Sequence, residues 1–199
     1  MIVSPNEGSI SRSIFVASAM KVPLGIFYNR RDFQYVGESL NQIETRTFLG
    51  DSVEGKDIII ISDMLDSGRD LIASASELKS RGAGRIICAV SFAQFTEGIQ
   101  PLRQAWESGL IERIFSTDMS YRPPEVLSSP WYTDIPMADD LALLISALNH
   151  DASLSRLMAP AARIDQLLEE QKKKILPQSS LTDKQLSFAD INPQNSLEE

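Results

Sequence analysis

Four consecutive isoleucines at positions 58–61 constrain the fold of this chain more than any other feature of its sequence. β-Branched residues favour strands, and an unbroken apolar run of this kind is typical of a strand that is buried on both faces. Strand-like and helix-like segments alternate on either side of the run, which is the pattern of an α/β protein. We therefore predict a central, mostly parallel sheet with helices on both of its faces.

Hydrophobic periodicity and turn residues locate the other elements. Residues 117–131 contain three prolines, at positions 123, 124 and 130, and are expected to form a loop. We expect helices at 9–20, 71–80, 98–108, 137–148, 153–158 and 160–175, and further strands at 1–5, 23–28, 44–49, 85–90 and 111–116.

The chain divides by composition into one domain and a tail. We expect the domain to span residues 1–165, and a terminal helix with a tail to span 166–199. From residue 176 onward the sequence is rich in Gln, Ser, Asn, Pro and acidic residues, which predicts disorder. No turn precedes the strand-like residues 1–5. We therefore expect that further sequence precedes Met1 in the complete gene, or that Met1 is a truncation point.

The overall charge and the cysteine content exclude several classes of protein. A net charge of −8 argues against non-specific binding to nucleic acid or to an anionic membrane. The chain has no apolar stretch near 20 residues and no signal-peptide pattern. The single cysteine, Cys88, excludes a disulfide framework and fits a reducing compartment. We predict a cytoplasmic protein.

Residues 62–70, with the sequence Ser-Asp-Met-Leu-Asp-Ser-Gly-Arg-Asp, connect the isoleucine strand to a helix. In open parallel sheets, ligands bind beyond the carboxyl ends of the strands, where helices begin. The amides around Ser67 and Gly68 can bind an anion at a helix N-terminus. Asp63 and Asp66 can accept hydrogen bonds from sugar hydroxyls or hold a hydrated Mg²⁺. The alternative is an ordinary strand-to-helix turn in which Asp66 or Ser67 is the N-cap.

This segment resembles the phosphoribosyl pyrophosphate signature, in which an apolar strand and an acidic pair are followed by Asp-Thr-Gly. Further segments resemble motifs of the ribose-phosphate pyrophosphokinase (phosphoribosyl pyrophosphate synthetase) family in the same order. They are residues 2–8, 27–31, 50–57 and 149–155. The resemblance covers residues 1 to about 165 and is to the C-terminal half of family members only.

The resemblance implies a three-layer, type I phosphoribosyltransferase fold. It also implies diphosphoryl transfer from ATP to ribose 5-phosphate in nucleotide biosynthesis, with Mg²⁺ as cofactor and ribose 5-phosphate or phosphoribosyl pyrophosphate as ligand. ATP would bind only with a second half or subunit. In the implied roles, Arg31 faces the transferred group, Asp63 and Asp66 face the ribose hydroxyls or the metal, and Ser67, Gly68, Arg69 and Asp70 surround the 5-phosphate.

Several residues depart from the family pattern at these positions. Asn6 stands where the family has an aspartate, Asn29 where it has a catalytic lysine, and Ser62 where it has an acid. A neutral amide cannot stabilise phosphoryl charge as a cation does. Arg69 replaces a glycine and Asp70 a phosphate-holding threonine.

The replacement at position 70 places a negative charge beside the expected phosphate. A carboxylate within about 4 Å of a phosphate costs on the order of several kcal/mol unless a cation offsets it. Arg69 is one candidate for that cation, and the alternative is that both side chains point to solvent. Together these departures predict reduced or lost catalysis.

Three hypotheses follow. The first is the ribose 5-phosphate-binding half of a ribose-phosphate pyrophosphokinase-like enzyme. The second is a catalytically degenerate regulatory or scaffold subunit of an active synthetase, which the departures favour. The third is a free-standing phosphoribosyltransferase, for which no segment clearly provides a base-binding hood. The family resemblance also implies a homo-oligomer, or a hetero-oligomer with an active synthetase.

Overall fold

The computed structural model describes residues 1–36, 39–155 and 159–171, with side chains described outside 29–45. The chain forms two units, Met1–Ala152 and Ser153–Glu199. In the second unit residues 160–171 are helical, within the helix expected at 160–175. The helix expected at 153–158 falls partly outside the described residues, and 153–155 are not helical. The boundary expected at residue 165 stays a prediction.

A mostly parallel sheet lies at the centre of the first unit, as the sequence predicts. Its described part has seven strands in the order β3-β2-β1-β4-β5-β6-β7, and every neighbouring pair is parallel except β2 and β3. The strands are β1 Ile2–Ser4, β2 Leu24–Val36, β3 Ser39–Gly50, β4 Ile58–Leu65, β5 Ile86–Ala93, β6 Arg113–Thr117 and β7 Tyr132–Ile135.

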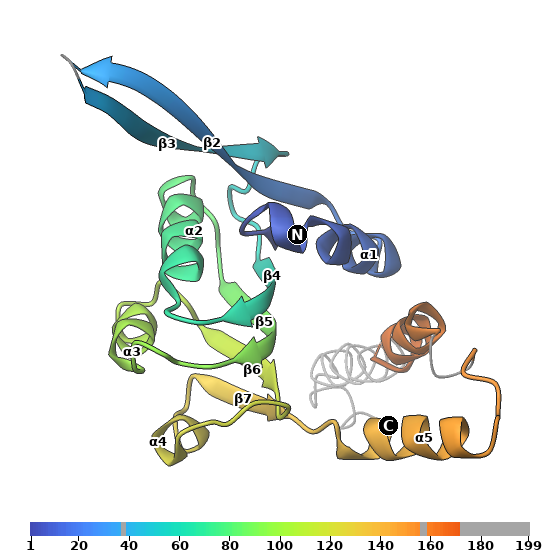
Figure 1. Ribbon diagram of the computed structural model, residues 1–199. Helices are drawn as coiled ribbons and strands as arrows, with labels where there is room; N and C mark the ends of the chain where they lie inside the picture. Colours follow the sequence, from blue (N-terminus) through green and yellow to red (C-terminus); the bar gives the residue numbers. More distant parts are fainter. Residues whose placement is uncertain (37–38, 156–158, 172–199) are drawn as a thin grey trace, which may run out of the picture. The chain divides into compact units, whose positions relative to one another are not determined.

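Helices cover both faces of this sheet (Figure 1). The two faces differ in the size of their cores: one is a large cluster with the buried side chains of α2 and α3, and the other is a small cluster beneath α1. The helices are η1 Glu7–Ser9, α1 Ile10–Met20, α2 Arg69–Ser80, α3 Gln100–Glu107, α4 Pro124–Leu127 and α5 Ala138–Asn149. This arrangement confirms the α/β fold class expected from the alternation of elements.

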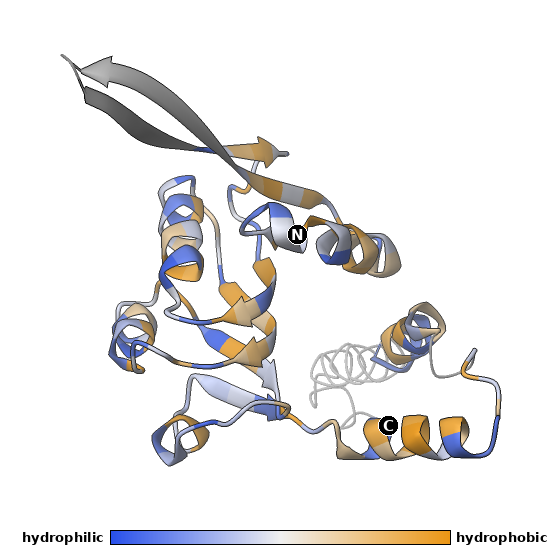
Figure 2. Cartoon of the chain, viewed as in Figure 1, coloured by the Kyte–Doolittle hydropathy of each residue, from blue (hydrophilic) through white to orange (hydrophobic). Residues whose placement is uncertain are grey.

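Cys88 lies in the larger core, on β5. Its side chain is fully buried, and burial raises the pKa of its thiol to about 12. By contrast α5 has no buried residue, although apolar residues run along it (Figure 2). No helix among the described residues combines the length and the apolar character needed to cross a membrane.

The structure corrects several expected boundaries. Pairing with β5 continues from Ser62 opposite Val90 to Leu65 opposite Ala93, so the loop expected at 62–70 is reduced to residues 66–68. The polar stretch 29–42 is largely strand, because β2 and β3 pair as one long antiparallel hairpin. Two further elements lie where no strand or helix was expected: β7, a short strand bounded by prolines 130 and 136, and α4, inside the loop expected at 117–131.

Candidate functional site

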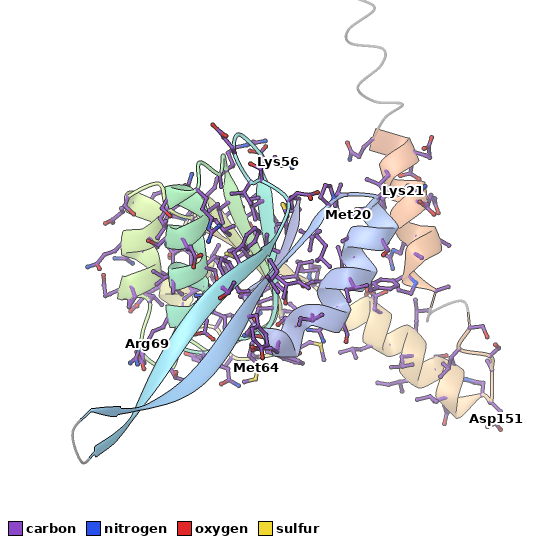
Figure 3. The ribbon with its side chains drawn as sticks, turned by 90° about the horizontal axis from the view of Figure 1, so that it is seen from above. Met20, Lys21, Lys56, Met64, Arg69 and Asp151 are labelled. Atoms are coloured by element: carbon purple, nitrogen blue, oxygen red, sulfur yellow. The ribbon has the colours of Figure 1, made fainter. Side chains whose placement is uncertain are left out.

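A cavity of about 320 Å³ opens at the carboxyl end of β4, where α2 begins. Its lining comes from the end of β4, from residues 66–68 that connect β4 to α2, and from the first turn of α2, and one residue comes from the turn after β1. Figure 3 shows Met64 and Arg69 at the end of the sheet opposite to Lys56, which precedes β4. The lining residues are Asn6, Ser62, Met64, Leu65, Asp66, Ser67, Gly68, Arg69, Asp70 and Leu71.

Gly68 makes the tight entry into α2 possible. Its φ of 78° lies in the left-handed region that glycine adopts without steric cost. A Cβ at this position would lie 2.8 Å from Cδ2 of Leu102, a buried side chain of α3. Gly68 is therefore required both by its backbone conformation and by the approach of α3.

The amides at the start of α2 remain available to a ligand. Among the described residues, no backbone carbonyl accepts a hydrogen bond from the amides of residues 66–71. Gly68 is the N-cap, and no side chain caps the helix. The alternative that Asp66 or Ser67 is the N-cap is therefore wrong; Ser67 Oγ only accepts a long contact of 3.5 Å from the amide of Arg69.

Asp66 is held in place from the neighbouring loop. Thr96, which follows β5, donates a hydrogen bond from its hydroxyl to Oδ1 of Asp66. The second carboxylate oxygen has no such partner among the described residues, and Asp66 is exposed in the cavity lining. This arrangement orients a carboxylate toward the cavity, where it can accept hydrogen bonds from ligand hydroxyls.

Arg69 and Asp70 do not pair with each other. Nη2 of Arg69 lies 2.5 Å from Oε1 of Glu97, and its Nε donates to Oε2 of the same carboxylate at 3.1 Å. Asp70 is exposed in the cavity lining. The choice that the sequence left open is thus resolved: the partner of Arg69 is Glu97, and Arg69 does not neutralise Asp70.

Asp63 lies away from the cavity. Strand β4 continues through this position, and the Asp63 side chain forms an ion pair with Arg12 of α1. Arg12 Nη1 also donates to Oγ of Ser91 at 3.3 Å. The structure therefore brings together the predicted residues 66–70 but separates Asp63 from them.

The same separation bears on the predicted metal site. Within the described ranges, no group of three or more His, Cys, Asp or Glu side chains is placed to hold a metal ion. Asp66 and Asp70, however, line one cavity. Protein-bound Mg²⁺ commonly uses only one or two carboxylates and completes its coordination with water and substrate oxygens. The donor set of this cavity therefore fits Mg²⁺ in that manner, with Asp70 in place of the predicted Asp63.

The expected catalytic segment lies on the hairpin. Asn29 and Arg31 belong to β2, opposite Arg46 and Glu44 of β3. The side chains of Asn29 and Arg31 lie outside the described residues, so the role of Arg31 stays a prediction.

Sequence reasoning did not identify Glu97 or Arg46, and it left open whether residues 91–96, which include Thr96, line the ligand site or form a packed loop. Thr96 and Glu97 orient Asp66 and Arg69 from the loop after β5, and Arg46 reaches from β3 to the turn after β1. A neighbouring loop at the carboxyl edge of a parallel sheet is the general signal for the first two residues. No local sequence signal marks Arg46.

Comparison with known proteins gives a consistent result. The family described as Phosphoribosyl transferase domain matches residues 1–123. A ribose-phosphate pyrophosphokinase from Vibrio cholerae is 28% identical over 158 residues, which cover 79% of this chain and 47% of that protein. The enzyme of the same name from Prochlorococcus marinus is 35% identical over 119 residues, which cover 59% of this chain and 33% of that protein.

A solved structure resembles the fold as well. The phosphoribosylpyrophosphate synthetase from Mycobacterium smegmatis superposes with a TM-score of 0.57 at 22% identity, covering 76% of this chain and 45% of that chain. The type I phosphoribosyltransferase fold expected from the sequence is thereby confirmed. The chain spans less than half the length of each of these three relatives.

Proposed function

This chain belongs to the phosphoribosyl transferase domain family, with ribose-phosphate pyrophosphokinases among its relatives, and from this premise we propose that its cavity binds the ribose phosphate part of ribose 5-phosphate or phosphoribosyl pyrophosphate. The observation that carries the proposal is the set of amides at residues 66–71, which have no carbonyl acceptor and border the cavity. Helix N-termini of this kind bind phosphate through their amides and their dipole.

Each part of the cavity has a distinct role in this proposal. The amides of Ser67, Gly68 and the following residues donate to the 5-phosphate, and the missing Cβ of Gly68 leaves the backbone accessible. Asp66, oriented by Thr96, accepts hydrogen bonds from the ribose hydroxyls. When bound, Mg²⁺ would be held by Asp66 and Asp70 and would neutralise phosphate charge.

Diphosphoryl transfer from ATP to ribose 5-phosphate is the finer proposal for the whole protein. It requires an ATP site that we assign to a second half or to another subunit, since this chain spans less than half the length of its relatives. Arg31 on β2 is proposed to face the transferred group. We place the protein in the cytoplasm as an oligomer with itself or with an active synthetase.

A second candidate is a catalytically degenerate subunit that binds the sugar phosphate, or only keeps the fold, and regulates an active synthetase. The observation that favours it is the position of Asp70. Two carboxylates, Asp66 and Asp70, border a cavity proposed to take a phosphate. The neighbouring cation, Arg69, is already ion-paired with Glu97. Negative charge at the edge of the cavity opposes anion binding unless a cation offsets it.

Calorimetric titration of the full chain with ribose 5-phosphate, in the presence of Mg²⁺, tests the binding proposal. We expect saturable binding, weakened at least tenfold by Asp66→Asn, since about 1.4 kcal/mol of lost hydrogen bonding corresponds to that factor. The matched control is Asp139→Asn on α5, which removes an exposed carboxylate outside the cavity and should leave the affinity unchanged.

Two outcomes would contradict the proposal. If the unchanged chain does not bind, the cavity is not a ribose phosphate site. If Asp66→Asn binds as tightly as the unchanged chain, the carboxylate does not contact the sugar. Phosphorus NMR of the chain combined with an isolated ATP-binding half, in the presence of ATP, ribose 5-phosphate and Mg²⁺, then separates the two candidates, because phosphoribosyl pyrophosphate forms only if this chain supplies a working sugar-phosphate half.

A further inference from the structure

Arg46 occupies an unusual place for a strand arginine. It lies on β3, and its guanidinium carbon is 4.2 Å from the ring centroid of Phe27, a fully buried side chain of β2. An arginine over an aromatic face gains a cation–π interaction, which is stronger where water is excluded. The stacking fixes the guanidinium against the base of the hairpin.

The same guanidinium contacts two segments that contribute residues to the cavity lining, the turn after β1 and helix α2. Its Nη2 donates to the carbonyl of Pro5 at 2.8 Å, and also to Oγ of Ser74 on α2. Pro5 directly precedes Asn6, which lines the cavity. Ser74 is fully buried and donates in turn to the carbonyl of Asp70 at 2.6 Å. One side chain therefore joins the turn after β1 to the first turn of α2.

Arg46 also places positive charge behind Asp70. Burial lowers the pKa of Arg46, while the carboxylates of Asp70, Glu77 and Glu7 act in the opposite direction, with Asp70 the strongest of the three. An arginine keeps its proton under all ordinary conditions, so this charge is permanent. Because Arg69 is paired with Glu97, Arg46 is a second cation near enough to interact with the Asp70 charge, and it is linked through Ser74 to the Asp70 backbone.

We propose that Arg46 is a positioning residue of the cavity: its guanidinium holds the Asn6 turn against the start of α2 and offsets the negative charge that Asp70 brings to an anion site. The inference rests on the proposed binding of a sugar phosphate. It explains how a carboxylate can stand at the edge of such a site, because a neighbouring permanent cation compensates for it.

The test compares three variants of the full chain. Arg46→Met keeps the apolar stem and removes the charge and the hydrogen bonds, and Arg46→Lys keeps the charge but loses the fork of donors. The matched control is Arg81→Met. The Arg81 guanidinium lies 5.3 Å from the ring centroid of Phe48 and pairs with Glu77 on α2, and Arg81 is not in the cavity lining.

Two quantities are measured for each variant. Titration with ribose 5-phosphate should show at least tenfold weaker binding for Arg46→Met, a smaller loss for Arg46→Lys, and no change for Arg81→Met. Amide exchange followed by NMR, without ligand, should be at least tenfold faster in Arg46→Met at Ser9, whose amide donates to Oδ1 of Asn6, and at Ile72, whose amide donates to the carbonyl of Gly68, because the two segments are no longer joined.

A double variant separates the charge from general structural support. In the Asp70→Asn background there is no carboxylate to offset, so Arg46→Met should weaken ribose 5-phosphate binding less than it does in the unchanged chain. A purely structural arginine would cause the same loss in both backgrounds, which would overturn the charge-offset part of the inference. If Arg46→Met does not fold, the cycle is run with Arg46→Ala and Arg46→Lys, where the lysine should retain more affinity than the alanine.

The failure of this inference is distinguishable from failure of the proposed function. If the unchanged chain does not bind ribose 5-phosphate, the proposed function fails, while the exchange measurement still decides whether Arg46 joins the two segments. Exchange rates in Arg46→Met equal to those of the unchanged chain would overturn the inference. Equal effects of Arg46→Met and Arg81→Met would also overturn it.

Discussion

Two polar clusters lie at the carboxyl edge of the sheet, and they differ in whether their hydrogen-bonding groups are already satisfied. In the cluster around Arg122, between β6 and β7, Arg122 donates from Nε and Nη2 to both oxygens of Asp134, at 3.0 and 2.7 Å. Its Nη1 donates to the carbonyls of Asp118 and Ser120, and the hydroxyl of Tyr132 also donates to Asp134. At the start of α2, by contrast, the amides have no carbonyl acceptor among the described residues.

This difference distinguishes polar groups that stabilise the fold from polar groups that can bind a ligand. A cluster whose donors and acceptors satisfy one another fixes the path of a loop and leaves nothing for a ligand. A row of backbone donors that borders a cavity without acceptors is satisfied by water or by an anion. Polar residues gathered at a sheet edge are therefore not evidence of a binding site unless their donors remain available.

The largest effect is expected from Gly68→Ala, at the start of α2. A positive φ costs a residue with a Cβ about 1–2 kcal/mol, and the contact with Leu102 adds about 1–3 kcal/mol of overpacking. We expect the free energy of unfolding in urea to fall by about 2–5 kcal/mol. The control is Gly98→Ala, where φ is 79° and no atom lies within 4 Å of the added Cβ, so only the first cost applies. Equal losses in the two variants would show that α3 does not restrict this turn.

Breaking the cluster around Arg122 with Arg122→Met should have the next largest effect. The Arg122 side chain is only 16% exposed, and its removal leaves Asp134 without its charged partner. Loss of one partner of a buried ion pair costs about 3–5 kcal/mol, and partial exposure reduces this to about 1–3 kcal/mol. Chemical denaturation measures the loss. The matched variant Arg85→Met breaks the exposed pair with Asp57 and should reduce the free energy of unfolding by less. Equal losses in the two variants would mean that the cluster around Arg122 does not stabilise the fold more than an exposed ion pair does.

Alkaline pH should have the smallest effect on stability, again through the cluster around Arg122. Burial, together with the hydrogen bond to Asp134, raises the pKa of Tyr132 to about 12. Because the pKa is raised above its unfolded value of about 10, the stabilisation is complete below pH 10 and is lost as the pH rises toward 12. Thermal denaturation across this range should show the decline, and Tyr132→Phe should reduce its slope. An unchanged slope in the variant would indicate that the phenol is already in contact with water.

The central strand and the two-sided sheet could be read from the sequence, since four β-branched isoleucines at 58–61 favour a strand that is buried on both faces. The end of that strand could not be predicted from the sequence, because pairing with β5, and not local preference, extends it to Leu65. The same extension decides the site. Asp63 stays within the strand and meets Arg12, whereas Asp66 leaves the sheet and reaches the cavity.

Arg46 shows a second limit of sequence reasoning. Its role depends on the register of the hairpin, which pairs Phe27 with Phe48 and brings residue 46 within reach of Pro5 and Ser74. These positions are separated by 41 and 28 residues in the chain. Periodicity and motif spacing carry no information about contacts at that range, and the β2–β3 hairpin was expected only as two short strands.

The burial of Cys88 makes this chain suited to site-directed labelling. Its only thiol is enclosed in the core and stays protonated at neutral pH, so maleimide and iodoacetamide reagents should not reach it in the folded state. A cysteine introduced at exposed Met64, in the cavity lining, would therefore be the one reactive thiol of the native protein. A fluorophore attached there would report ligand entry without removal of the natural cysteine.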